Sequence, residues 1–164
     1  MLKIQRMLAV IGAALAISFV PGIRANAMTP QETEFVSIAE EGVRQAQQFN
    51  VSEEEIELIA LVTMAEAEGE CEYGKRLVID TILNRVDSVY FPDTIYDVIY
   101  QKNQFSSMWN GRVKRVRATE EVKKLVREEL IFRTDTEVTF FTAGRYGRYG
   151  IPMFQIGGHY FSKY

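Results

Sequence analysis

Residues 58–72, LIALVTMAEAEGECE, decide the fold because they join an apolar helix to a cluster of four glutamates. Apolar residues recur at spacings of three and four, which is the period of one helix face. Most other positions are also apolar, so we expect this helix to be buried nearly all round. Glu66 falls between Val62 and Ile59 on the helix wheel. A carboxylate there is costly to ionise, which favours a general acid; a glutamate that reaches water at the helix end is the alternative.

Helix signals flank this stretch on both sides. Ser52 and Glu55 form a capping box that starts the central helix, and a threonine cap followed by proline predicts an earlier helix from Thr29 to about Phe49. Later patterns predict helices over 73–89, 94–100 and 119–130, a loop or short hairpin over 101–111, and strands over 138–142, 153–156 and 159–161. The sequence therefore predicts an α+β fold: one mostly helical domain with a small antiparallel sheet towards the C-terminus.

The first 27 residues have the pattern of a secretory signal peptide. Lys3 and Arg6 precede an uncharged apolar run, Met7 to Val20, and Ala25-Asn26-Ala27 fits a cleavage site. The run is shorter than the ~20 residues that span a bilayer. We expect cleavage after Ala27, a secreted domain over 28–164 and no membrane association after cleavage; an uncleaved anchor is the alternative.

Composition excludes several classes of function. The formal net charge is −3, and the signal segment would remove three further cations, so sequence-independent nucleic-acid binding is disfavoured. A single cysteine, Cys71, forbids an intramolecular disulfide, and with one histidine, His159, it leaves too few ligands for a structural zinc site. We expect no cofactor.

The carboxylates after Glu66 allow three kinds of chemistry. Alternating glutamates at 66–72 resemble calcium ligands, but no Asx-Gly loop follows, so we expect no metal. Glu66 and Glu70 lie one turn apart on the same side, which does not suit a glycosidase pair that flanks a bond unless Asp80, Asp93 or Asp135 supplies the second group. A mechanism with one acid/base fits better.

Nucleophilic catalysis is disfavoured. A Ser-His-Asp triad would need a nucleophile elbow, which the sequence lacks. The glutamates around Cys71 would raise the pKa of its thiol and lower its reactivity.

The second half of the chain holds basic and aromatic residues in loops. Arg112, Lys114, Arg115 and Arg117 form a run for which a solvated face is the favoured interpretation, with nucleic acid or an anionic wall polymer as alternatives. Aromatic side chains that can stack on sugar rings gather in the same half: Phe105, Trp109, Tyr146, Tyr149 and Tyr160.

Four motifs in order resemble one known family. They are Ala65-Glu66-Ala67-Glu68-Gly69-Glu70, Ile82-Leu83-Asn84-Arg85-Val86, Val98-Ile99-Tyr100-Gln101 leading to Gln104-Phe105-Ser106, and Gln155-Ile156-Gly157-Gly158-His159-Tyr160-Phe161. Together they resemble the cell wall hydrolase family of the spore cortex-lytic enzymes SleB and CwlJ. The resemblance covers about residues 57–161. Glu68 and Cys71 depart from it, since an arginine and a proline are common there.

The resemblance implies a lysozyme-like domain that cleaves peptidoglycan between N-acetylmuramic acid and N-acetylglucosamine, as a lytic transglycosylase with Glu66 as its single acid/base. The resemblance also implies that Glu70 and Asn84 support the site. The expected substrate-binding residues are Gln104, Phe105, Ser106, His159 and Tyr160, to which the aromatic pattern adds Tyr146. We expect a monomer that acts on glycan strands in the cell wall or the spore cortex during germination. A muramidase and a non-catalytic wall-binding protein are the alternatives.

Overall fold

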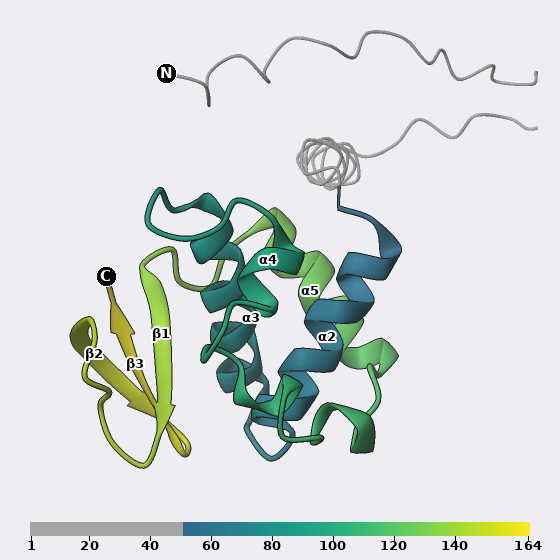
Figure 1. The fold of residues 1–164 in the computed structure, drawn as a ribbon. Helices are drawn as coiled ribbons and strands as arrows, with labels where there is room; N and C mark the ends of the chain where they lie inside the picture. The colour runs from purple at the N-terminus through teal and green to yellow at the C-terminus, as the bar shows by residue number, and fades with distance from the viewer. Residues whose placement is uncertain (1–50) are drawn as a thin grey trace, which may run out of the picture.

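The computed structural model describes residues 51–164. The predicted signal segment and the predicted helix over 29–49 lie outside the described residues. Figure 1 shows a group of helices with a small sheet packed on one side.

Three of the helices begin directly after a capping residue that the sequence predicts. The helices are α2 (Glu53–Ala67), α3 (Glu72–Asp87), α4 (Ile95–Ile99) and α5 (Glu120–Ile131), with short 3₁₀ helices η1 (Ser106–Met108) and η2 (Val113–Arg115) between α4 and α5. Ser52 and Glu55 form the predicted capping box of α2. Thr94 and Thr119 cap α4 and α5 by accepting from backbone N–H groups. The alternative of a hairpin over 101–111 is wrong, because η1 occupies this segment.

The sheet has three strands: β1 (Val138–Ala143), β2 (Ile151–Ile156) and β3 (His159–Lys163). The strand order is β1-β3-β2 with both pairs antiparallel, so β3 is central. β2 and β3 form a hairpin whose turn is Gly157-Gly158. β1 packs against α3, which places the sheet beside the helices (Figure 1).

The core surrounds α2, which packs against α3, α4 and α5. Ile59, Ala60 and Val62 are fully buried, whereas Glu57 and Glu68 face solvent. The prediction of a helix buried nearly all round therefore holds except along one polar strip. In the described part of the chain, none of the helices has the length and apolar character needed to span a membrane.

Candidate active site

Glu66 lies in the last turn of α2, where its side chain is half-buried. Its Oε1 accepts a hydrogen bond from the backbone N–H of Ser107 in η1, at 3.2 Å. The bond joins segments that are 41 residues apart. It occupies one carboxyl oxygen and leaves Oε2 available to carry or accept a proton. The carboxyl group is thus oriented by the fold and still within reach of solvent.

Arg112 fixes the same turn of α2 from the other side. Its Nε donates to the carbonyl oxygen of Ala65 at 2.6 Å, and its Nη2 lies 3.1 Å from Glu68 Oε2. Carbonyl groups in the last turn of a helix lack partners within the helix, so the guanidinium satisfies one that would otherwise need water. The solvated face predicted from the sequence holds for Lys114, Arg115 and Arg117, which are exposed. Arg112 has a further role, because its Nε binds a backbone carbonyl beside Glu66 while its side chain stays 42% exposed.

Glu70 brings the β2–β3 turn to the end of α2. Its Oε1 accepts from the backbone N–H of Gly158 at 3.0 Å, and its own carbonyl accepts from Lys75 Nζ at 2.7 Å. The carboxylate lies so close to Gly157 that an added Cβ would lie 1.7 Å from Oε2. This contact is consistent with the supporting role predicted for Glu70, since it holds the turn near the helix that carries Glu66.

Four of the predicted substrate-binding residues reach the surface at least in part. Gln104 and Ser106 are exposed beside η1, and Tyr146 stands edge-on to the half-buried Tyr160 with 5.1 Å between ring centroids. These four side chains remain candidates for contact with a ligand.

Two other predicted residues lie inside the protein. Phe105 is 1% exposed and packs in the main core, so its prediction as a substrate-binding residue is wrong. It anchors the start of η1 instead. His159 is 7% exposed, with its ring 5.1 Å from that of Phe141, and its Nδ1 has no partner among the residues described. Contact between His159 and a substrate would need the neighbouring chain to move, and its role stays a prediction.

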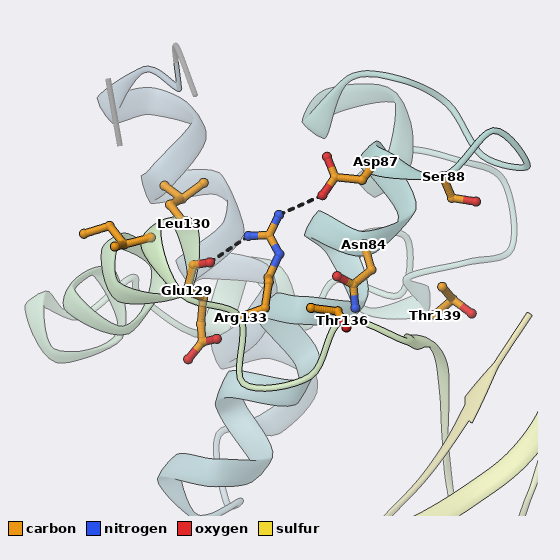
Figure 2. A pocket seen from close by; sticks show the side chains of 9 residues that line it. Asn84, Asp87, Ser88, Glu129, Leu130, Arg133, Thr136 and Thr139 are labelled. Carbon is orange, nitrogen blue, oxygen red and sulfur yellow. Dashed lines mark hydrogen bonds and ion pairs between the residues drawn. The ribbon is translucent and has the colours of Figure 1, made fainter. Parts of the chain in front are cut away.

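Asn84 supports the sheet and not Glu66 directly. Its Nδ2 donates to the carbonyls of Asp135 and Val138, each at 2.9 Å, which ties the start of β1 to α3. It also lines a cavity of about 410 Å³ between α3, α5 and the chain before β1. Figure 2 shows Arg133 in this cavity, bonded to Asp87 and to the carbonyl of Glu129. Glu66 does not line this cavity.

Two of the three carboxylates considered as partners for Glu66 have other contacts. Asp135 Oδ1 accepts from the backbone N–H groups of Glu137 and Val138, at 2.7 Å and 3.0 Å. Asp80 is fully buried and accepts from the backbone N–H of Asp135 at 2.8 Å. Burial, together with the neighbouring Glu129, raises the pKa of Asp80 to about 8. Asp93 is exposed in the loop before α4. Over residues 51–164, no group of three or more His, Cys, Asp or Glu side chains is placed to hold a metal ion.

Sequence reasoning missed Ser107 and Arg112, the residues that hold Glu66 and its turn. Ser107 contributes only its backbone N–H, so the identity of the residue gives no indication of this role. The one signal for Arg112 was its position at the start of a basic run that follows an exposed aromatic residue, Trp109.

Comparisons with known proteins agree on one relationship. The family model described as Cell Wall Hydrolase matches residues 69–162. The spore cortex-lytic enzyme of Oceanobacillus iheyensis is 37% identical over 62 residues, which cover 38% of this chain and 22% of that protein. The spore cortex-lytic enzyme of Bacillus cereus is 36% identical over 62 residues, covering 38% and 24%. The matched segment thus spans about a quarter of the length of these curated relatives.

Solved structures extend the likeness over the domain. The catalytic domain of Bacillus cereus SleB aligns with a TM-score of 0.59 and 28% identity, covering 68% of this chain and 91% of that one. The catalytic domain of the germination-specific lytic transglycosylase SleB from Bacillus anthracis aligns with a TM-score of 0.58 and 27% identity, covering 68% and 96%. Glu66 lies just before the segment that the family model matches.

Proposed function

The chain belongs to the cell wall hydrolase family, and from this premise we propose that it cleaves the glycan strands of peptidoglycan. The predicted family and the predicted α+β, lysozyme-like fold class are confirmed by the family model and by the SleB catalytic domains. Membership in a family of hydrolases supports an enzyme over a wall-binding protein.

Glu66 carries the proposal for the chemistry. One of its oxygens accepts from the Ser107 N–H at 3.2 Å, and the group is half-buried where α2 meets η1. A carboxyl group held at one oxygen has a defined direction for proton transfer at the other. Glu70 is also held at one oxygen, by the Gly158 N–H, but it lies beyond the end of α2. The single observation that favours Glu66 is that it is the one glutamate of the 66–72 cluster held inside the last turn of α2, against η1.

The proposed reaction needs one acid/base. Protonated Glu66 donates its proton to the glycosidic oxygen between N-acetylmuramic acid and N-acetylglucosamine as that bond breaks. The resulting carboxylate then takes the proton from the muramic 6-hydroxyl, whose oxygen bonds to C1 and closes a 1,6-anhydro ring. The proton lost in the first step is regained in the second, so the enzyme returns to its starting state. No second carboxylate is required, which fits the buried positions of Asp80 and Glu129.

The place of action follows from the substrate. Peptidoglycan lies outside the cytoplasm, so we propose that residues 1–27 direct secretion and that residues 28–164 act in the cell wall or the spore cortex as a monomer. The relatives named spore cortex-lytic enzymes and germination-specific lytic transglycosylase support a role in germination.

Product analysis tests this function. Muropeptides released from purified peptidoglycan by the full chain should carry 1,6-anhydro ends, and Glu66→Gln should lower their release by about 10²–10⁴-fold. The glutamine keeps an oxygen that accepts from Ser107 N–H, so the fold should persist. Glu57→Gln is the matched control, because Glu57 is exposed on the same helix and lies outside the site.

Each alternative gives a different product. Reducing muramic ends would indicate a muramidase, and the absence of soluble products would indicate a binding protein. Full activity of Glu66→Gln would remove Glu66 from the mechanism whatever the product.

A further inference from the structure

An aromatic cluster borders the main core between α4 and η1, and the chemistry proposed above makes no use of it. Its rings belong to Tyr96, Tyr100 and Trp109. The ring centroids of Tyr96 and Tyr100 are 4.3 Å apart, and those of Tyr100 and Trp109 are 6.1 Å apart. Tyr96 is 58% exposed and Trp109 is 61% exposed, whereas Tyr100 is half-buried and packs against the core. Contiguous exposed rings of this kind mark a surface that binds a ligand or a partner.

The segment that carries Trp109 is fixed beside Glu66 at both of its ends. Before the tryptophan, the Ser107 N–H donates to Glu66 Oε1 at 3.2 Å. After it, Arg112 Nε donates to the carbonyl of Ala65 at 2.6 Å. η1 and η2 both pack against α2, and Figure 1 shows these short helices, in green, beside the lower end of that helix. The indole therefore projects from a short loop that hydrogen bonds hold next to the Glu66 carboxyl group.

Tyr100 holds the indole on one side. The planes of the two rings meet at 79°, which is the edge-to-face arrangement that aromatic quadrupoles favour. A side chain held in this way has less rotamer freedom to lose when a ligand arrives, so its immobilisation costs less free energy. Most of the indole stays open to solvent. Its open surface is apolar, and the C–H face of a sugar ring is the apolar surface of a glycan, so the two are complementary.

We propose that Trp109 stacks on a sugar ring of the glycan strand, next to the bond that Glu66 cleaves. The proposal rests on the proposed function and assigns a sugar subsite within that same site. Because the contact is made with the apolar face of the ring, the strand should bind without its peptides. High salt should leave this binding intact, since screening acts on charges and not on apolar contact.

Fluorescence tests the subsite directly, because Trp109 is the only tryptophan of the chain. The Glu66→Gln full chain is titrated with soluble, peptide-free strands of alternating N-acetylglucosamine and N-acetylmuramic acid, and binding is measured in parallel by calorimetry. We expect the emission to shift to shorter wavelength and acrylamide quenching to fall, at low salt and at about 1 M salt alike.

Four results overturn the proposal. They are the absence of binding, binding with unchanged emission, an emission shift that requires the peptides, and a shift caused by anionic lipid vesicles but not by the strands.

Variants of two exposed rings locate the effect. In the Glu66→Gln background, Trp109→Ala should weaken calorimetric binding about tenfold, and Trp109→Tyr, which keeps a flat ring, should recover most of that loss. Phe132→Ala is the matched control. Phe132 is 69% exposed and directly follows α5, whose Arg127 pairs with Glu53 at the opposite end of α2. Equal losses in Trp109→Ala and Phe132→Ala overturn the subsite.

Activity separates this proposal from the function on which it rests. With Glu66 in place, Trp109→Ala should lower kcat/KM for muropeptide release about tenfold. Release by Trp109→Ala at the rate of the parent overturns the subsite and leaves peptidoglycan cleavage intact. Strand binding at Trp109 by a parent protein that releases nothing from sacculi supports the subsite and overturns the cleavage.

Discussion

Arg85 shows at the scale of one residue how strongly the core constrains a charge. It is 4% exposed, and its guanidinium carbon lies 5.1 Å, 5.3 Å and 5.4 Å from the ring centroids of Phe91, Phe105 and Phe140. Its Nε donates to the carbonyl of Thr139 at 2.7 Å. Burial lowers the pKa of Arg85 to about 10, so the group remains charged at neutral pH. Three aromatic faces take the place of water around this cation.

We expect Arg85→Lys to lower the free energy of unfolding by about 2 kcal/mol or more. An ammonium group is more strongly hydrated than a guanidinium and is not planar, so it gains less from the three rings and loses more on burial. Arg85→Met, which keeps a long apolar side chain without the charge, should cost less than the lysine. Urea denaturation measures both. A lysine variant within about 0.5 kcal/mol of the parent would show that the rings do not favour the guanidinium.

At the scale of elements, the contact between Glu70 and the β2–β3 turn joins the sheet to α2. Gly157 adopts a φ of 53°, and an added Cβ would lie 1.7 Å from Glu70 Oε2. Since that oxygen ends a flexible side chain, Gly157→Ala should move the carboxylate away and break its bond to Gly158. We expect kcat/KM to fall at least about tenfold, with a loss of about 1–2 kcal/mol in stability from the backbone conformation.

Glu70→Ala is the matched variant for this contact. It removes the same bond without changing the turn, so it should also lower kcat/KM by at least about tenfold. The double variant Gly157→Ala/Glu70→Ala should be scarcely less active than Glu70→Ala alone, because both changes act on one interaction. Fully additive losses in kcat/KM, measured with circular dichroism confirming the fold, would show that the two residues act separately.

The elements themselves were predictable because their signals are local. Ser52, Thr94 and Thr119 mark helix starts in the sequence, and each caps the expected helix in the structure. The contacts that build the site are long-range: Gly158 lies 88 residues from Glu70. Neither periodicity nor propensity records which loop packs on which helix end. Phe105 shows the same limit. The sequence around an aromatic loop residue looks the same whether its side chain packs in the core, as Phe105 does, or contacts a ligand.

At the scale of the whole molecule, a buried pair of carboxyl groups couples stability to pH. Asp80 of α3 is fully buried, and Glu129 of α5 is 1% exposed. Glu129 accepts from Arg76 at 2.7 Å and from Thr134, while Asp80 accepts from the N–H of Asp135. Burial first, and then the adjacent Glu129, raise the pKa of Asp80 to about 8 against the lowering effects of Asp135 and Arg133. The folded protein therefore holds a proton at Asp80 that the unfolded chain releases near pH 4.

The sign of the pH dependence follows from this raised pKa. The contribution of Asp80 is fully present below about pH 4 and is lost as the pH rises through about 8, because the folded state binds the extra proton across that window. The free energy of unfolding should fall between these limits by up to about 1.4 kcal/mol per pH unit from this group. Asp80→Asn is neutral at every pH, keeps an acceptor for the Asp135 N–H and should remove this slope when urea denaturation is measured at pH 5 and pH 8. Asp93→Asn, at an exposed carboxylate, should retain the parent slope. A parent and an Asp80→Asn variant with equal slopes would mean that the proton resides elsewhere, and that the contact between α3 and α5 is held without it.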